Sequence, residues 1–173
     1  MQIRILLVED NKIQKLVNER ILHKAGYTVL NAKDGQEALR LARETIPDIV
    51  LLDMLLPKLG GREVMQALRK DPPTAHIPVL IFSSLPQANE VKLTLEGAAG
   101  YFQKSRLVEH PAEGEKELIK LIEDVVQKSR ELNKPGLVTS TPGMALGQIR
   151  IWSGNDCRCW SPAQSRRFIQ THE

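Results

Sequence analysis

The chain has 173 residues, of which 42% are hydrophobic and 26% are charged. These fractions are typical of a globular protein, and they exclude a disordered chain and a small disulfide-stabilised fold. The formal net charge of +3 indicates neither a strongly basic nucleic-acid-binding protein nor an acidic tail.

Five short apolar runs are expected to form strands. They are rich in leucine and β-branched residues, a composition typical of strands that are buried on both faces of a parallel sheet. In chain order, the runs are residues 2–8, 27–31, 49–52, 77–82 and 100–103.

Apolar residues at helical spacing follow each of these runs. The second helix is expected to begin at Asp34, because Glu37 three residues later gives the spacing of a capping box. A third helix is expected over residues 61–70. The apolar residues of the other helices are, in chain order, Ile13, Leu16, Val17 and Ile21; Val91 and Leu95; and Leu118, Leu121, Ile122, Val125 and Val126.

This alternation of strand and helix predicts a doubly wound α/β fold, with a parallel five-stranded sheet and helices on both faces. The fold is expected to span residues 1–132. A linker rich in Gly, Pro, Ser and Thr is expected over 133–147, and a tail over 148–173 is expected to form a small hairpin or no regular structure. In such sheets the functional crevice lies beyond the carboxyl ends of the strands.

Polar residues follow four of the five expected strands. Glu9 and Asp10 come after the first strand and Asp53 after the third, while the fourth ends in Ser83 and the fifth in Lys104. If the first and third strands are neighbours, three carboxylates crowd together and repel one another. A hard divalent cation such as Mg²⁺ would compensate for this repulsion.

These residue types suit phosphoryl chemistry. Lys104 supplies a point charge for a phosphoryl oxygen. Asp53 stands alone after its strand, so it is the expected nucleophile, and attack on phosphorus would make it an acyl phosphate. The hydroxyl of Ser83 is then placed to hydrogen-bond the new phosphoryl group.

The order and spacing of four motifs resemble the receiver domain of two-component response regulators, of the stand-alone chemotaxis type. The resemblance covers roughly residues 3–129. Its motifs are LLVEDN at 6–11, DMLLP at 53–57 with Gly61, PVLIFS at 78–83 and YFQK at 101–104.

The resemblance implies the flavodoxin-like strand order 2-1-3-4-5 and a phosphorelay function. It implies that Asp53 accepts a phosphoryl group from a histidine kinase or a phosphotransfer protein, and that Ser83 and Lys104 sense the phosphate. Tyr101 would be the aromatic switch residue. The implied ligands of Mg²⁺ are the side chains of Glu9, Asp10 and Asp53 and the main-chain carbonyl of Leu55.

The expected output is contact with a downstream protein target through the fourth helix, the fifth strand and the last helix. No DNA-binding output domain and no membrane segment are expected, and a homodimer is left open. The location is expected to be cytoplasmic, because no export signal is visible and the cysteines, Cys157 and Cys159, are few.

The sequence departs from the family pattern at several positions. Ser105 stands where the family usually has proline, Gly60 where aspartate is common, and Ser84 where a small residue such as alanine is common. Residues 107–114 make the approach to the last helix longer than usual.

Other readings of the residues remain open at this stage. A phosphatase that forms an aspartyl phosphate would be expected to show an Asp-x-Asp pattern from Asp53 onward, but the second position of that pattern is Leu55. A flavodoxin-like cofactor binder would need a hydroxyl-rich phosphate loop after the first strand, where Glu9 and Asp10 stand. A receiver-like scaffold that does not use phosphate is kept open by Gly60 and Ser105. The tryptophans and arginines of the tail leave a minor nucleic-acid role open.

Overall fold

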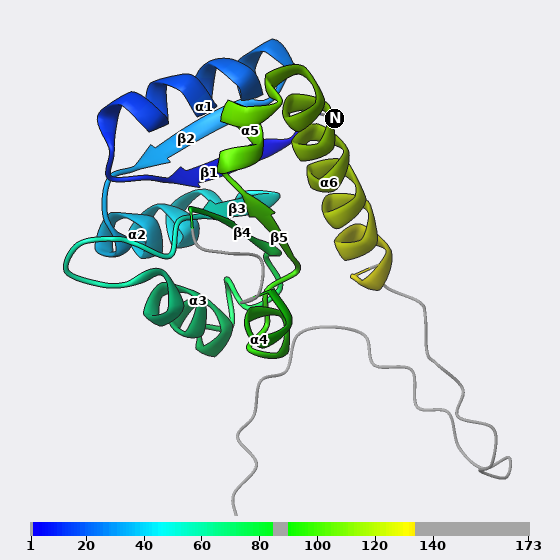
Figure 1. Ribbon diagram of the computed structural model, residues 1–173. Helices are drawn as coiled ribbons and strands as arrows, with labels where there is room; N and C mark the ends of the chain where they lie inside the picture. Colours follow the sequence, from blue (N-terminus) through cyan, green and yellow to red (C-terminus); the bar gives the residue numbers. More distant parts are fainter. Residues whose placement is uncertain (1, 85–89, 134–173) are drawn as a thin grey trace, which may run out of the picture. The chain divides into compact units, whose positions relative to one another are not determined.

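The computed structural model describes residues 2–84 and 90–133. Five parallel strands form one sheet in the order β2-β1-β3-β4-β5, which confirms the predicted flavodoxin-like fold (Figure 1). The strands are β1 (Arg4–Val8), β2 (Thr28–Ala32), β3 (Ile49–Leu52), β4 (Val79–Ser83) and β5 (Gly100–Gln103).

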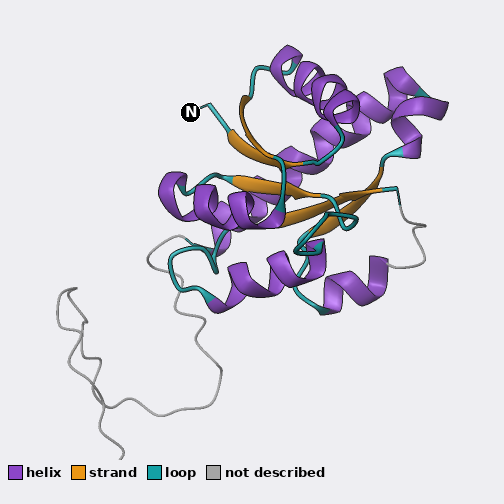
Figure 2. Cartoon of the chain, turned by 90° about the vertical axis from the view of Figure 1, so that its left-hand side faces the viewer, coloured by secondary structure: helices purple, strands orange, loops and turns teal. Residues whose placement is uncertain are grey.

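Helices cover both faces of this sheet (Figure 2). The helices are α1 (Lys12–Lys24), α2 (Gly35–Thr45), α3 (Gly61–Lys70), α4 (Glu90–Leu95), α5 (Ser105–Glu109) and α6 (Pro111–Leu132). Among the described residues, none of the helices is long and apolar enough to cross a membrane.

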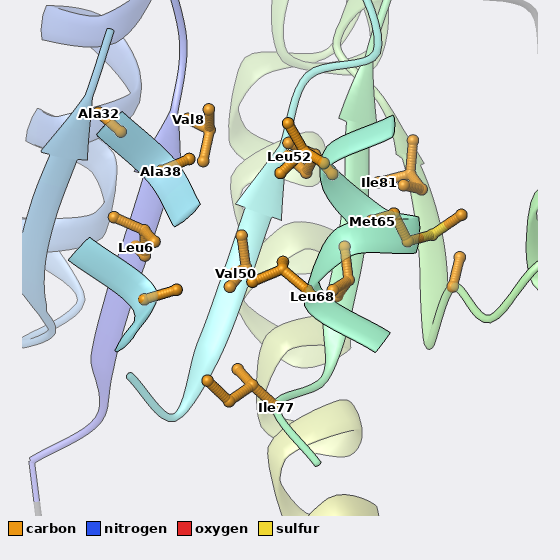
Figure 3. Packing of buried hydrophobic residues seen from close by; sticks show 14 of the residues in the cluster. Leu6, Val8, Ala32, Ala38, Val50, Leu52, Met65, Leu68, Ile77 and Ile81 are labelled. Carbon is orange, nitrogen blue, oxygen red and sulfur yellow. The ribbon is translucent and has the colours of Figure 1, made fainter. Parts of the chain in front are cut away.

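Alternate residues of each strand pack into two separate cores. Leu6 and Val8 of β1 face a core that includes buried residues of α2, α3 and α4 (Figure 3). Ile5 and Leu7 of the same strand face a second core, to which α1 and α6 contribute. This two-residue alternation explains why the strands appear in the sequence as continuous apolar runs.

The start of α2 follows from local sequence, as predicted. The side chain of Asp34 accepts a hydrogen bond from the backbone N–H of Glu37 at 2.9 Å, and Glu37 in turn accepts one from the N–H of Lys33 at 3.0 Å. The bond from Glu37, followed by the ammonium of Lys58, lowers the pKa of Asp34 below its ordinary value. The orphan N–H of Glu37 in the first turn is thereby satisfied, and so is the N–H of Lys33 just before the cap.

Two helices turn most of their expected apolar residues outward, although Ile21 of α1 is buried. In α1, Ile13 is 75% exposed, whereas the polar residue Asn18 is only 5% exposed. In α4, Leu95 is 84% exposed and Leu93 is buried. Helical spacing of apolar residues therefore identified both helices, but it did not identify the face that packs on the sheet.

The structure adds one helix that the sequence patterns did not indicate. Residues 105–109 form α5 after β5, and α6 begins at Pro111, within the segment that was expected to be a longer approach to the last helix. The two helices meet closely, because a Cβ atom at Gly114 would lie 2.6 Å from the carbonyl oxygen of Arg106. A helix of five residues is too short to show a periodic pattern.

Helix α6 ends at Leu132, and the boundary of the folded region after residue 132 stays a prediction. All of the expected tail over residues 148–173, including Cys157 and Cys159, and all of the expected linker except Asn133 lie outside the described residues.

Candidate functional site

The sheet brings the carboxyl ends of β1 and β3 together. Val8 and Leu52 are partners in the parallel ladder between these strands. The ladder continues for one more residue, because the N–H of Asp53 donates to the carbonyl of Val8 at 3.2 Å. Glu9 and Asp10 follow β1 directly, so the strand register itself places them beside Asp53.

Glu9, Asp10 and Asp53 form the acidic cluster that the sequence led us to expect. One carboxylate oxygen of each lies within 4.8 Å of the others, and among the described residues this is the one group of three or more side chains with a metal-binding arrangement. Glu9 and Asp53 are buried, whereas Asp10 is exposed. Oxygen ligands from carboxylates suit Mg²⁺, so this donor set fits that ion.

Burial raises the pKa of the Glu9 carboxyl above its ordinary value. The ammonium of Lys104 opposes this rise, and the charge of Asp53 adds to it. Glu9 is thus held in a position where its negative charge is costly without a positive neighbour.

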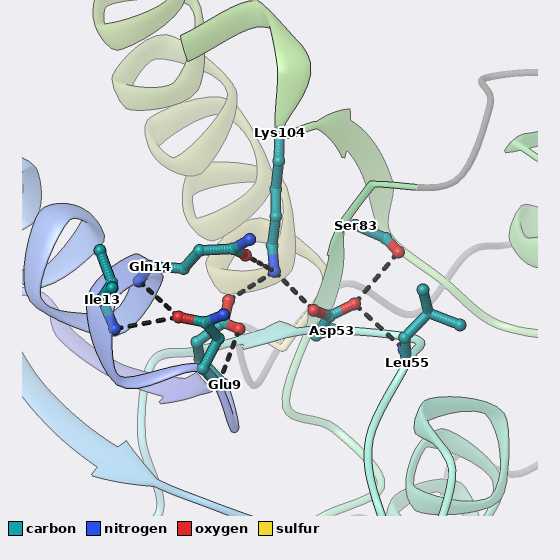
Figure 4. A network of polar contacts seen from close by, with 8 residues as sticks. Glu9, Ile13, Gln14, Asp53, Leu55, Ser83 and Lys104 are labelled. Carbon is teal, nitrogen blue, oxygen red and sulfur yellow. Dashed lines mark hydrogen bonds and ion pairs between the residues drawn. The ribbon is translucent and has the colours of Figure 1, made fainter. Parts of the chain in front are cut away.

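Lys104 supplies that positive neighbour from the end of β5. Its backbone N–H donates to the carbonyl of Ser83 at 3.0 Å, which fixes the start of the side chain. Its Nζ donates to Glu9, to Asp53 Oδ2 at 2.5 Å and to Gln14 Oε1 at 3.0 Å (Figure 4). Lys104 is 8% exposed, so all of these contacts are made largely out of water.

The other carboxylate oxygen of Asp53 has two further partners. The hydroxyl of Ser83 donates to Oδ1 at 3.1 Å, and the backbone N–H of Leu55 donates to the same atom at 3.1 Å (Figure 4). Both oxygens of Asp53 are therefore held, one by a cation and one by neutral donors. Such a carboxylate has a fixed direction, which a nucleophile at phosphorus requires.

The remaining predicted residues lie at or near this edge of the sheet. The backbone of Leu55 turns back toward Asp53 through the hydrogen bond just described; its carbonyl as a metal ligand stays a prediction. Tyr101 is buried in β5, where it pairs with Ile81 of β4. Its role as a switch also stays a prediction.

The positions that depart from the family pattern all have ordinary roles in the fold. Ser105 is the first residue of α5, and the described residues contain no cis peptide bond. Gly60 precedes α3, and its N–H donates to the side chain of Glu63 at 2.7 Å. Ser84 is exposed.

Sequence reasoning missed two features beside the site. The first is Gln14, a neutral partner of Lys104 that no motif marked. The second is a groove of about 690 Å³ between α1 and α5, which Lys104 helps to line. Ile13 and Val17 on α1 and Val108 on α5 line this groove, and these three side chains are 75%, 52% and 81% exposed. The signal for it was present in α1, where the apolar residues Ile13 and Val17 lie on either side of the polar Gln14 in the sequence.

Comparisons with known proteins match this chain to response regulators. The family model for the response regulator receiver domain matches residues 5–110. The polar-differentiation response regulator DivK of Brucella anthropi is 33% identical over 101 residues, which cover 58% of this chain and 82% of DivK.

Solved structures agree with this match. A response regulator receiver domain protein from Clostridium thermocellum is 26% identical, with a TM-score of 0.65, and the similarity covers 75% of this chain and 98% of that one. The receiver domain of the sensor histidine kinase PA1611 from Pseudomonas aeruginosa is 26% identical, with a TM-score of 0.63, covering 73% of this chain and 99% of that one. The latter has a magnesium ion coordinated in its active-site cleft.

Proposed function

The chain belongs to the response regulator receiver domain family, and from this premise we propose that Asp53 is a phosphoacceptor in a two-component phosphorelay. The observation that carries the proposal is the environment of its carboxylate. One oxygen contacts Lys104, the other accepts a hydrogen bond from Ser83, and two further carboxylates lie within 4.8 Å. The proposed role is that of a signalling acceptor rather than of a turnover enzyme.

The proposed donor is a phosphohistidine of a histidine kinase or a phosphotransfer protein. A carboxylate oxygen of Asp53 attacks phosphorus, and the bond from phosphorus to the histidine nitrogen breaks. The electron pair of that bond stays on the nitrogen, which takes a proton from water, and Asp53 becomes an acyl phosphate. Lys104 and Ser83 are placed to hold the oxygens of the transferred group.

Mg²⁺ is part of the proposal because the three carboxylates suit it. Glu9, Asp10 and Asp53, with the main-chain carbonyl of Leu55, are the proposed ligands. When bound, the ion would neutralise part of the charge on the phosphoryl oxygens. The approach of a doubly negative phosphoryl group to this acidic edge would otherwise be opposed by like charge.

The exposed apolar residues beside the site suit a protein donor. Ile13 and Val17 on α1 and Val108 on α5 line the groove next to Lys104. Burying such side chains against a partner is favourable, at about 25 cal/mol per Å² of apolar surface. We therefore assign the groove to the phosphodonor protein. A kinase-driven relay also suits the cytoplasmic location expected from the sequence.

The proposed output is a change in the surface formed by α4, β5 and α6. Phosphorylation adds a charge of about −1.5 to −2, which would draw the hydroxyl of Ser83 toward the phosphoryl group and bias the position of Tyr101. On α4, Val91 and Leu95 are 72% and 84% exposed, as expected for a face that contacts a downstream protein or a second copy of the chain. The proposed division of the chain is a receiver domain over 1–132, a linker over 133–147 and a tail over 148–173.

The test is acyl phosphate formation with labelled phosphoramidate and Mg²⁺. We expect wild-type protein to become labelled, Asp53→Asn to remain unlabelled, and the exposed control Asp124→Asn to behave as wild type. Equal labelling of Asp53→Asn would rule out Asp53 as the acceptor. Steady hydrolysis of a phosphomonoester would indicate a phosphatase instead, and a wild-type protein that neither binds Mg²⁺ nor becomes labelled would indicate a scaffold.

A further inference from the structure

The ammonium group of Lys104 has three N–H donors, and oxygens of three other side chains accept hydrogen bonds from it. Its Nζ contacts Glu9, Asp53 and the side-chain oxygen of Gln14. The ammonium group of a residue that is 8% exposed needs partners for all of its protons, because unpaired donors are costly out of water. The three acceptors together therefore determine where the ammonium points.

Two of these acceptors change during the proposed reaction, and one does not. Glu9 and Asp53 belong to the acidic cluster, so a bound cation would compete with Lys104 for their oxygens. Phosphorylation also converts one oxygen of Asp53 into the bridging oxygen of an acyl phosphate. Gln14 is neutral, lies outside the cluster and comes from another element, the first turn of α1, so its contact with Lys104 is compatible with every state of the site.

The position of Gln14 is fixed independently of Lys104. Its backbone N–H donates to the side chain of Asn11 at 3.1 Å, as part of the cap that begins α1. The N–H of Asn11 in turn donates to Glu9 Oε1 at 3.3 Å. The first turn of α1 is thus tied to the acidic cluster, which keeps the Gln14 carboxamide within reach of Lys104.

We propose that Gln14 is the positioning residue of this site: its side-chain oxygen holds the ammonium of Lys104 toward the phosphoryl position when the carboxylates are taken up by the cation and the phosphoryl group. This inference rests on the proposed function of Asp53 and deepens it. Gln14 does not touch the reacting atoms itself. Its effect on phosphoryl transfer is exerted through Lys104 alone.

The test uses the full chain with Gln14→Met, which keeps the length of the side chain and removes the acceptor. Gln36→Met is the matched control, because Gln36 is exposed in the first turn of α2 and has no role in the site. We expect Gln14→Met to lower the rate constant for labelling by phosphoramidate about tenfold, in line with the loss of one hydrogen bond to a charged group. The dissociation constant of Mg²⁺ should stay within about twofold of wild type, because Gln14 lies outside the acidic cluster.

A second readout reports on Lys104 directly. The ¹H–¹⁵N signal of its ammonium group, assigned by its absence from Lys104→Met, is expected to be visible in wild type because its protons are held. It should broaden in Gln14→Met, where one proton is released to water, and return in Gln14→Glu, which restores an acceptor at the same distance. A loosened helix would not be repaired by Gln14→Glu, so this rescue separates positioning from a structural role.

A wild-type labelling rate in Gln14→Met overturns the proposal, and so does an unchanged ammonium signal in that variant. Failure of the proposed function is recognised separately, by the absence of labelling in wild type. In that case the ammonium signal still tests the contact between Gln14 and Lys104. Loss of the signal in Gln14→Met with its return in Gln14→Glu supports this contact, and an unchanged signal refutes it.

Discussion

Replacing Gly61 with alanine should disturb the backbone that carries Asp53, the proposed phosphoacceptor. A Cβ atom at Gly61 would lie 2.3 Å from the carbonyl oxygen of Asp53 and 2.7 Å from the Cα of Met54. Both are backbone atoms, so no flexible side chain can move aside. The backbone of Asp53 would have to shift by more than about 1 Å to reach an ordinary contact distance.

The expected cost follows from this overlap. Overpacking against a fixed neighbour costs about 1 to 3 kcal/mol, and a clash with backbone belongs at the upper end. At about 4 °C per kcal/mol for a domain of this size, Gly61→Ala should lower Tm by about 8 to 12 °C. The same shift should move the Asp53 carboxylate away from Ser83 and Lys104, and labelling by phosphoramidate should therefore be slower.

Gly60→Ala is the matched control, because a Cβ atom at Gly60 meets only the mobile end of Glu63, at 3.2 Å. We expect its Tm to lie within about 3 °C of wild type. The assay is thermal unfolding followed by circular dichroism, together with the labelling rate of both variants. Equal melting temperatures for Gly61→Ala and Gly60→Ala would refute the argument from close backbone approach.

Three further predictions concern charge and burial. Mg²⁺ at a hundred times its dissociation constant should stabilise the wild-type fold by about 2.7 kcal/mol. In a thermal shift titration, Asp10→Asn should abolish most of this gain. An equal gain in both proteins would exclude Asp10 as a ligand. Arg69 donates to the carbonyls of Ala75 (3.1 Å), Ile77 (2.8 Å) and Gly97 (2.9 Å). Arg69→Met should therefore lower the free energy of unfolding, measured in urea, by about 3 kcal/mol. A loss below about 1 kcal/mol would contradict this expectation. Burial, with the nearby carboxylate of Glu123, raises the pKa of Tyr27 to about 12. Because the pKa of Tyr27 is higher in the folded state than in the unfolded state, its contribution to stability is complete below about pH 10 and is lost as the pH rises toward 12. The free energy of unfolding, measured in urea, should therefore decline less over that range in Tyr27→Phe than in wild type. An equal decline in both proteins would count against this argument.

The sequence by itself determined the order of the five strands and of every helix except α5, together with the residue types at the strand ends. Strands buried on both faces must be apolar at every position, so they were visible as continuous runs such as Ile49–Leu52. The start of α2 was visible because the cap formed by Asp34 and Glu37 is local. Glu9, Asp10, Asp53, Ser83 and Lys104 were found because strand ends in such a fold converge on one edge.

The tertiary structure decided which surfaces and contacts these elements share. Gln14 and Lys104 are 90 residues apart, and only the tertiary fold brings the first turn of α1 and the end of β5 together at one edge of the sheet. Helical periodicity indicates that a helix has an apolar face, but it does not indicate whether that face packs on the sheet; in α1, Asn18 is buried and Ile13 is exposed. Contacts of this kind depend on the strand order and on the orientation of whole helices, which no local pattern of residues encodes.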